Sequence, residues 1–226
     1  MANLIALVGS SGSGKSTSIR NLNPKETFII NVASKPLPFK GWKSNYTIWN
    51  KENPGGNLVN TSNVEVIGKI IAYIDKNRPE IKNVIIEDSQ YLMGFEAMDR
   101  AKEKGFEKFT DMAQKFYSVL KASIDVRDDL NVIVTCHSEN TGTADYPQLK
   151  IKTLGKMIDN IITVEGLFTY VLFTDITRDE NNQVVYSFIT HSDGTNTAKS
   201  PLGCFEEDRI PNDLAYVLSK IDEYNN

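Results

Sequence analysis

The stretch that decides the fold is residues 3–20, which read NLIALVGSSGSGKSTSIR. An apolar run from Leu4 to Val8 leads into the pattern Gly-x-x-x-x-Gly-Lys-Ser, and residues compatible with a helix follow it. This order of buried strand, glycine loop and helix start is the context in which the pattern binds phosphate. The sequence therefore predicts a nucleoside-triphosphate site directly after the first strand.

Each part of this motif, the P-loop, has an expected role. Glycines let the backbone curl so that successive N–H groups point at one phosphate, and the N-terminus of a following helix would add further donors. Lys15 is expected to reach the β- and γ-phosphates of ATP, and the Ser16 hydroxyl to be a ligand of Mg²⁺. The alternative, a flexible Gly/Ser turn with an incidental lysine, is disfavoured by the buried strand before it. The expected nucleotide-binding set is Gly9, Ser10, Ser11, Gly12, Ser13, Gly14, Lys15, Ser16 and Thr17.

Composition limits the class of protein. The 226 residues are 40% hydrophobic and 24% charged, which is typical of a globular protein with a sizeable core. The net charge of −4 excludes a strongly basic nucleic-acid binder, so any such contact needs a local patch or an assembly. Two cysteines form no disulfide framework, and the most apolar stretch, residues 161–173, is too short to span a membrane. A cytoplasmic protein is therefore expected.

Strand-like apolar runs alternate with helix-like patterns along the chain. This alternation predicts one α/β domain over residues 1–226, with a mainly parallel sheet that ends in antiparallel strands. Strands are expected at residues 4–8, 27–32, 46–49, 83–90, 131–136, 161–174 and 184–190. Helices are expected after the P-loop, from a capping box at residues 62–65 to Pro79, from residue 109 to about 127, and after Pro211.

Three polar positions at or near strand ends complete the predicted site. Asp88 and its neighbour Glu87 end one strand, and by strand alternation only one of them should face the phosphates; we expect Asp88 to serve Mg²⁺ with Ser16. His137 ends another strand, where it could hydrogen-bond the γ-phosphate or the attacking water, or simply cap a loop. Lys199 could reach a neighbouring subunit's phosphates, and a solvated turn lysine is the equal alternative.

Together these residues resemble the core of RecA-type ATPases over most of the chain. Lys199 with Gly203 resembles the lysine motif that RecA and DnaB-like proteins use across a subunit interface. Residues 35–39, 166–168 and 198–201 resemble single-domain ATPases of this superfamily that bacteriophages encode. The resemblance implies a three-layer, RecA-like P-loop NTPase fold, Mg²⁺-dependent ATP hydrolysis and a homo-oligomer with ATP between subunits. It also implies action on single-stranded DNA in phage recombination or replication, alongside a single-stranded-DNA-binding or annealing protein.

The chain departs from that family at the carboxylate that activates water. RecA carries its catalytic glutamate just after the second strand, where this chain has residues 33–35, Ala-Ser-Lys. Either Glu87 or Glu52 positions the water, or hydrolysis is slow. Pro201 stands where many relatives have arginine in the interface motif.

The family's DNA-binding loops correspond to residues 93–108 and 138–156. Both segments interleave basic and aromatic residues, a combination that can hold phosphates and stack bases, although ordinary solvated loops are as good an explanation for any one residue. The residues concerned are Phe95, Phe106, Tyr146, Lys150, Lys152 and Lys156.

Two other functions stay open beside the DNA-stimulated ATPase. A nucleoside or nucleotide kinase also uses this P-loop, but residues 138–156 contain no arginine-rich lid. A nucleotide-dependent binding switch with little hydrolysis would suit the missing glutamate. A GTPase is disfavoured, because residues 50–53, Asn-Lys-Glu-Asn, lack the aspartate that reads guanine.

Overall fold

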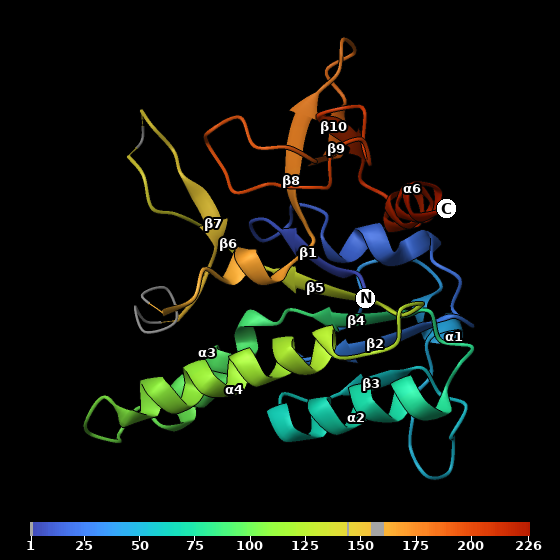
Figure 1. Ribbon diagram of the computed structural model, residues 1–226, viewed down its shortest axis with the longest axis vertical. Coiled ribbons are helices and arrows are strands. Elements are labelled where there is room, and N and C mark those ends of the chain that lie inside the picture. Colours follow the sequence, from blue (N-terminus) through green and yellow to red (C-terminus); the bar gives the residue numbers. More distant parts are fainter. Residues whose placement is uncertain (1, 144, 155–160) are drawn as a thin grey trace.

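The computed structural model describes residues 2–143, 145–154 and 161–226, which form an eight-stranded sheet (Figure 1). Its strand order is β10-β9-β8-β1-β5-β4-β2-β3. The six strands from β8 to β3 are parallel, and β9 runs antiparallel to both of its neighbours, β8 and β10. The sheet is thus mainly parallel with antiparallel pairing near the C-terminus, as predicted. The strands are β1 (Leu4–Val8), β2 (Thr27–Asn31), β3 (Leu58–Asn60), β4 (Asn83–Glu87), β5 (Asn131–Cys136), β8 (Tyr170–Arg178), β9 (Val184–Ile189) and β10 (Arg209–Pro211).

Helices cover both faces of the sheet, which makes three layers. Alternate side chains of β1 enter two separate cores, with Leu4 and Val8 in one and Ile5 and Leu7 in the other. The first core packs against α2 (Val64–Asn77), α3 (Gln90–Asp99) and α4 (Glu107–Ile124), which we call the α2–α4 face. The second packs against the 3₁₀ helix η1 (Ser16–Asn21), the short α1 (Trp42–Asn45) and α6 (Leu214–Asn225), the η1–α6 face.

The predicted helices form, with shifted ends. Helix α2 begins one residue later than the capping box indicates, because the Asn63 side chain accepts from Val66 N. In α6 the four predicted inward residues, Leu214, Val217, Leu218 and Ile221, are all buried. After the glycine loop the expected helix is only the six-residue η1, so it offers no long helix N-terminus for phosphate. None of the described helices is both long and apolar enough to cross a membrane.

The predicted strand at residues 46–49 is wrong. Only Ile48 forms a single bridge, to Leu58, and the real edge strand of this region is β3, which the pattern missed. The Asn57 side-chain amide accepts from Thr47 N at 2.8 Å and donates to the carbonyls of Pro24 and Asn45. These side-chain bonds take the place of a regular ladder.

Three other segments differ from prediction. Only residues 100–106 of the expected loop 93–108 lie outside helices, because α3 continues to Asp99 and α4 begins at Glu107. In this turn Arg100 pairs with Glu96, Glu103 and Asp111. Two parts of the expected loop 138–156 pair as antiparallel strands, β6 (Ser138–Asn140) with β7 (Leu149–Ile151). The strand expected from residue 161 begins only at Tyr170, after the 3₁₀ helix η2 (Val164–Leu167).

Candidate functional site

The glycine loop, residues 9–16, follows β1 and is held in shape by the neighbouring strand β8. Thr174 donates its hydroxyl to Ser13 Oγ at 2.6 Å, and Ser13 donates to Ser10 O at 2.8 Å. A Cβ on Gly9 would stand 1.8 Å from Thr174 Oγ1, so only glycine fits there. Gly12 and Gly14 have φ values of +76° and +98°, which favour glycine. The loop is therefore a fixed turn rather than a flexible linker.

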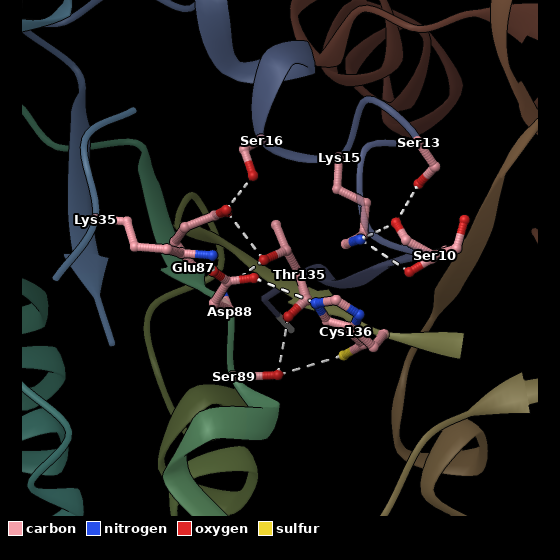
Figure 2. Close-up of polar contacts among 12 residues, drawn as sticks. Ser10, Ser13, Lys15, Ser16, Lys35, Glu87, Asp88, Ser89, Thr135 and Cys136 are labelled. Atoms are coloured by element: carbon pink, nitrogen blue, oxygen red, sulfur yellow. Dashed lines mark hydrogen bonds and ion pairs between the residues drawn. The ribbon is translucent and has the colours of Figure 1, made fainter. Parts of the chain in front are cut away.

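Lys15 lies inside this loop (Figure 2). Its buried ammonium donates to Gly9 O at 2.8 Å and to Ser10 O at 2.7 Å. An ammonium has three donors, so one remains for a ligand. Burial lowers the pKa of Lys15, and the charges of Glu87 and Asp88 oppose that shift.

Glu87 is the carboxylate beside Ser16. Alternation along β4 sends Ile85 to the η1–α6 face, so Glu87, two residues later, points toward the same face. There Ser16 Oγ donates to Glu87 Oε1, and Thr135 Oγ1 donates to Oε2 at 2.9 Å (Figure 2). Burial raises the pKa of Glu87, and the hydrogen bond from Ser16 offsets part of that shift.

Asp88 lies in a different environment from the one expected. Its φ of +60° ends the strand, its N–H donates to Thr135 Oγ1 at 2.7 Å, and its carboxylate pairs with Lys35 and with His137 Nε2 at 3.6 Å. Burial acts to raise the pKa of Asp88, but His137 and Lys35 outweigh it and hold the pKa below its ordinary value. The expectation that Asp88 is the acid next to Ser16 is thus corrected, since Glu87 occupies that place.

His137 connects Asp88 to the β6–β7 hairpin. It directly follows β5, as expected, and its ring meets the edge of Tyr91 with centroids 6.3 Å apart. Its carbonyl accepts from Lys152 N at 2.8 Å, just beyond β7. A displacement of His137 would therefore move both the contact to Asp88 and the base of the hairpin.

Other predicted residues lie outside this cluster. Lys199 pairs through its backbone with Val171 of β8, and no hydrogen bond or ion pair among the described residues joins its side chain to the acids. Glu52 lies exposed in the turn at residues 50–53, without such a link in the described chain. Lys150 lies 3.3 Å from Glu139, Lys152 is exposed, and Lys156 falls outside the described residues.

Three residues of the cluster are not among the site residues that the sequence predicts. Thr135 contacts both acids, Lys35 pairs with Asp88, and Thr174 supports the glycine loop. Thr135 left a signal, because it is a hydroxyl residue near the end of an otherwise apolar strand. Lys35 stands in the segment where the family's glutamate was missing.

The arrangement fits a phosphate with a divalent cation. A curled loop, a buried ammonium with a free donor, and a hydroxyl–carboxylate pair meet at the carboxyl ends of parallel strands, where ligands of open α/β sheets bind. Hydroxyl and carboxylate oxygens are ligands that Mg²⁺ accepts. Among the described residues, no group of three or more His, Cys, Asp or Glu side chains is placed to hold a metal ion. A cation at Ser16 and Glu87 would therefore need further oxygens from the phosphates or from water.

The comparisons with known proteins add no name to this site. A scan of protein-family models and a search of curated proteins find no match for the chain. The function of the chain is therefore inferred from the geometry of its site.

Proposed function

We propose that the glycine loop is a P-loop that binds Mg²⁺–ATP and that the chain is an ATPase. The observation that carries the proposal is the contact between Ser16 and Glu87 beside the ammonium of Lys15. Mg²⁺ bound there would neutralise charge on the β- and γ-phosphates. Ser16 would give it one oxygen directly, and Glu87 would orient its waters or bind it.

Hydrolysis by this site would be slow. A water-activating base works best when its pKa lies near the working pH. Asp88 is the second acid of the site, but Lys35 and His137 lower its pKa and so weaken it as a base. The lowered pKa of Asp88 therefore favours a second candidate function, a nucleotide-dependent binding switch that hydrolyses little ATP.

Single-stranded DNA is the partner that we propose for the switch. Two exposed aromatics carry this part: Phe106, 86% exposed in the α3–α4 turn, and Tyr146, 79% exposed between β6 and β7. Both segments project on the side toward which the parallel strands point (left in Figure 1). Exposed Lys102 and Lys104 lie next to Phe106 in the sequence, so bases could stack while phosphates meet ammonium groups.

We also propose that the chain forms a homo-oligomer, as its resemblance to RecA-type ATPases implies. A homo-oligomer would place Lys199 of one subunit against the ATP of the next. The side chain of Lys199 is partly exposed and makes no hydrogen bond or ion pair within the described chain, which leaves it able to reach a second copy. ATP with Mg²⁺ is expected to raise both oligomer size, measured by sedimentation, and affinity for single strands.

The test is calorimetric binding of Mg²⁺–ATP followed by phosphate release with and without single-stranded DNA. Lys15→Ala should abolish binding, while Lys25→Ala, which removes an exposed lysine outside the site, should leave it unchanged. His137→Ala and Lys199→Ala should bind ATP but lose DNA stimulation. Failure of the wild-type chain to bind Mg²⁺–ATP, or equal binding by Lys15→Ala, would overturn the proposal. Phosphoryl transfer to a nucleoside or nucleotide in an acceptor screen would identify a kinase instead.

A further inference from the structure

A pocket of about 420 Å³ opens against the glycine loop. Its volume falls within the usual range for small-molecule sites. Its walls come from the loop and η1, from β9, and from the junction of β10 with α6: Gly12, Gly14, Thr17, Arg20, Tyr186, Pro211 and Asn212. It shares loop residues with the phosphate site, but neither Glu87 nor Asp88 lines it. A ligand with its terminal phosphate near the acids can therefore extend its other end into this pocket.

Asn212 gives the pocket a polar group in need of a partner. Its side chain is 6% exposed, and the buried Nδ2 has no hydrogen-bond partner among the residues that the structure describes. A buried donor without an acceptor is unfavourable, so a ligand atom that accepts from it would be stabilised there. Both Nδ2 and Oδ1 lie 3.1 Å from the position that a Cβ on Gly14 would take, so the side-chain amide as a whole faces the loop side of the pocket.

The rest of the wall holds Asn212 in place. Its backbone N–H donates to Tyr186 O at 3.3 Å, and its carbonyl accepts from Arg20 Nη1 at 2.9 Å. Arg20 Nη1 also reaches Thr17 O at 3.1 Å, so one guanidinium joins η1 to the β10–α6 junction. The Tyr186 side chain is 44% exposed and presents a ring at the pocket surface. The backbone of Asn212 is thus fixed before a ligand arrives, and its side chain starts from a defined place in the wall.

We propose that this pocket is the adenosine subsite of the nucleotide, an inference that rests on the proposed function. The base lies against Tyr186, and the Asn212 amide reads its edge. An amide can donate to a ring nitrogen of adenine and accept from its N6 amino group. Guanine presents two adjacent donor groups, N1–H and the N2 amino group, which suit a carboxylate, and no carboxylate among the described residues lines the pocket. A single amide satisfies the N6 amino group and the adjoining ring nitrogen of adenine but leaves one of the two guanine donors without an acceptor, so the pocket favours adenine over guanine.

Three Mg²⁺-bound probes test the subsite by calorimetry: ATP, GTP and inorganic tripolyphosphate. Tyr186→Ala and Asn212→Ala should each weaken ATP binding about tenfold, because the first removes the ring on which the base stacks and the second removes the amide that bonds its edge. Both should leave tripolyphosphate binding unchanged. Tyr224→Ala is the matched control, since Tyr224 is 45% exposed and lies outside the pocket. Asn212→Asp, nearly the same size, should lower the ratio of ATP affinity to GTP affinity at least tenfold.

The outcomes separate this inference from the proposed function. Tripolyphosphate binding that depends on Lys15, with an ATP affinity that neither pocket substitution alters, would overturn the adenosine subsite and leave the phosphate site standing. Equal wild-type affinity for ATP and GTP would overturn the selection of adenine. Loss of all three probes from the wild-type chain would remove the proposed function itself. Circular dichroism of each variant verifies that it is folded.

Discussion

Glu87→Gln is the substitution that best tests how the two adjacent acids divide their roles. Gln keeps the shape of the side chain and an oxygen that can accept from Ser16, but it removes the charge. Burial raises the pKa of Glu87, so the ionised carboxylate destabilises the fold at neutral pH. Without nucleotide or metal, we therefore expect Glu87→Gln to unfold at the same temperature as the wild type or higher.

The same substitution should weaken the metal-dependent part of ATP binding. A unit charge about 4 Å from another is worth about 4 kcal/mol at the effective dielectric of a protein surface, which sets a ceiling. A carboxylate that acts through the ligands or waters of a metal typically contributes 10- to 100-fold in affinity or activity. Glu87→Gln should accordingly lower ATP affinity about 10- to 100-fold in Mg²⁺ and very little in EDTA.

Asp88→Asn provides the contrast. The pKa of Asp88 is held below its ordinary value, so its charge stabilises the fold at every pH above that ordinary value, and the contribution is lost as acid protonates it. Because the side chain of Lys35 is 58% exposed, losing the pair should cost only about 1 kcal/mol, or about 2–4 °C in Tm. Calorimetry and thermal unfolding of both variants decide the matter. If Asp88→Asn removed the Mg²⁺ dependence and Glu87→Gln kept it, the assignment would be reversed.

Three further predictions concern stability. Gly9→Ala should lower the free energy of unfolding by about 3 kcal/mol in urea, because its Cβ meets Thr174 Oγ1, and Thr174→Ala should recover part of the loss. Burial raises the pKa of Cys136 to about 12 from 9.0, so stability should fall between pH 9 and 12. Between these pH values, the free energy of unfolding should fall with pH about 1.4 kcal/mol per pH unit more steeply in the wild type than in Cys136→Ala. Equal slopes in the two proteins would contradict this. Asn57→Ala should cost about 2–4 kcal/mol in chemical denaturation, since it leaves several backbone groups without their partner.

The strands could be predicted from apolar runs wherever no side chain competes for the hydrogen bonds of the strand backbone. The runs at β1, β2, β4 and β5 are buried on both sides. Strands β1 and β5 have the predicted bounds, β2 ends one residue before its predicted end, and β4 ends three residues before it. Residues 46–49 have the same apolar character, yet Asn57 bonds their backbone in an irregular form. Strand β3 has three residues, too few for a periodic signal. The competing side-chain bonds come from a residue ten positions away, which local patterns do not record.

The candidate site was predictable in its loop and less so in its partners. Gly9 to Ser16 follow from a local pattern, but Thr174 supports Ser13 from 161 positions away. Alternation indicated that only one of Glu87 and Asp88 would face the phosphates. Choosing between them required knowing that the 3₁₀ helix η1, which follows the glycine loop, covers the face to which Ile85 points, and this depends on the path of the whole chain.

The left-handed turn at Asp88 explains how one dipeptide can serve two environments. In a continuing strand, neighbours point to opposite faces, and Asp88 would enter the apolar core of the α2–α4 face, where an unpaired charge is costly. The φ of +60° instead ends β4 at Glu87 and brings Asp88 to Lys35 and His137. Glu87 stays in the strand and faces Ser16. The Thr135 hydroxyl donates to the Glu87 carboxylate and accepts from the Asp88 N–H. A ligand that moved either residue would therefore also shift the hydrogen bond that Thr135 makes with the other.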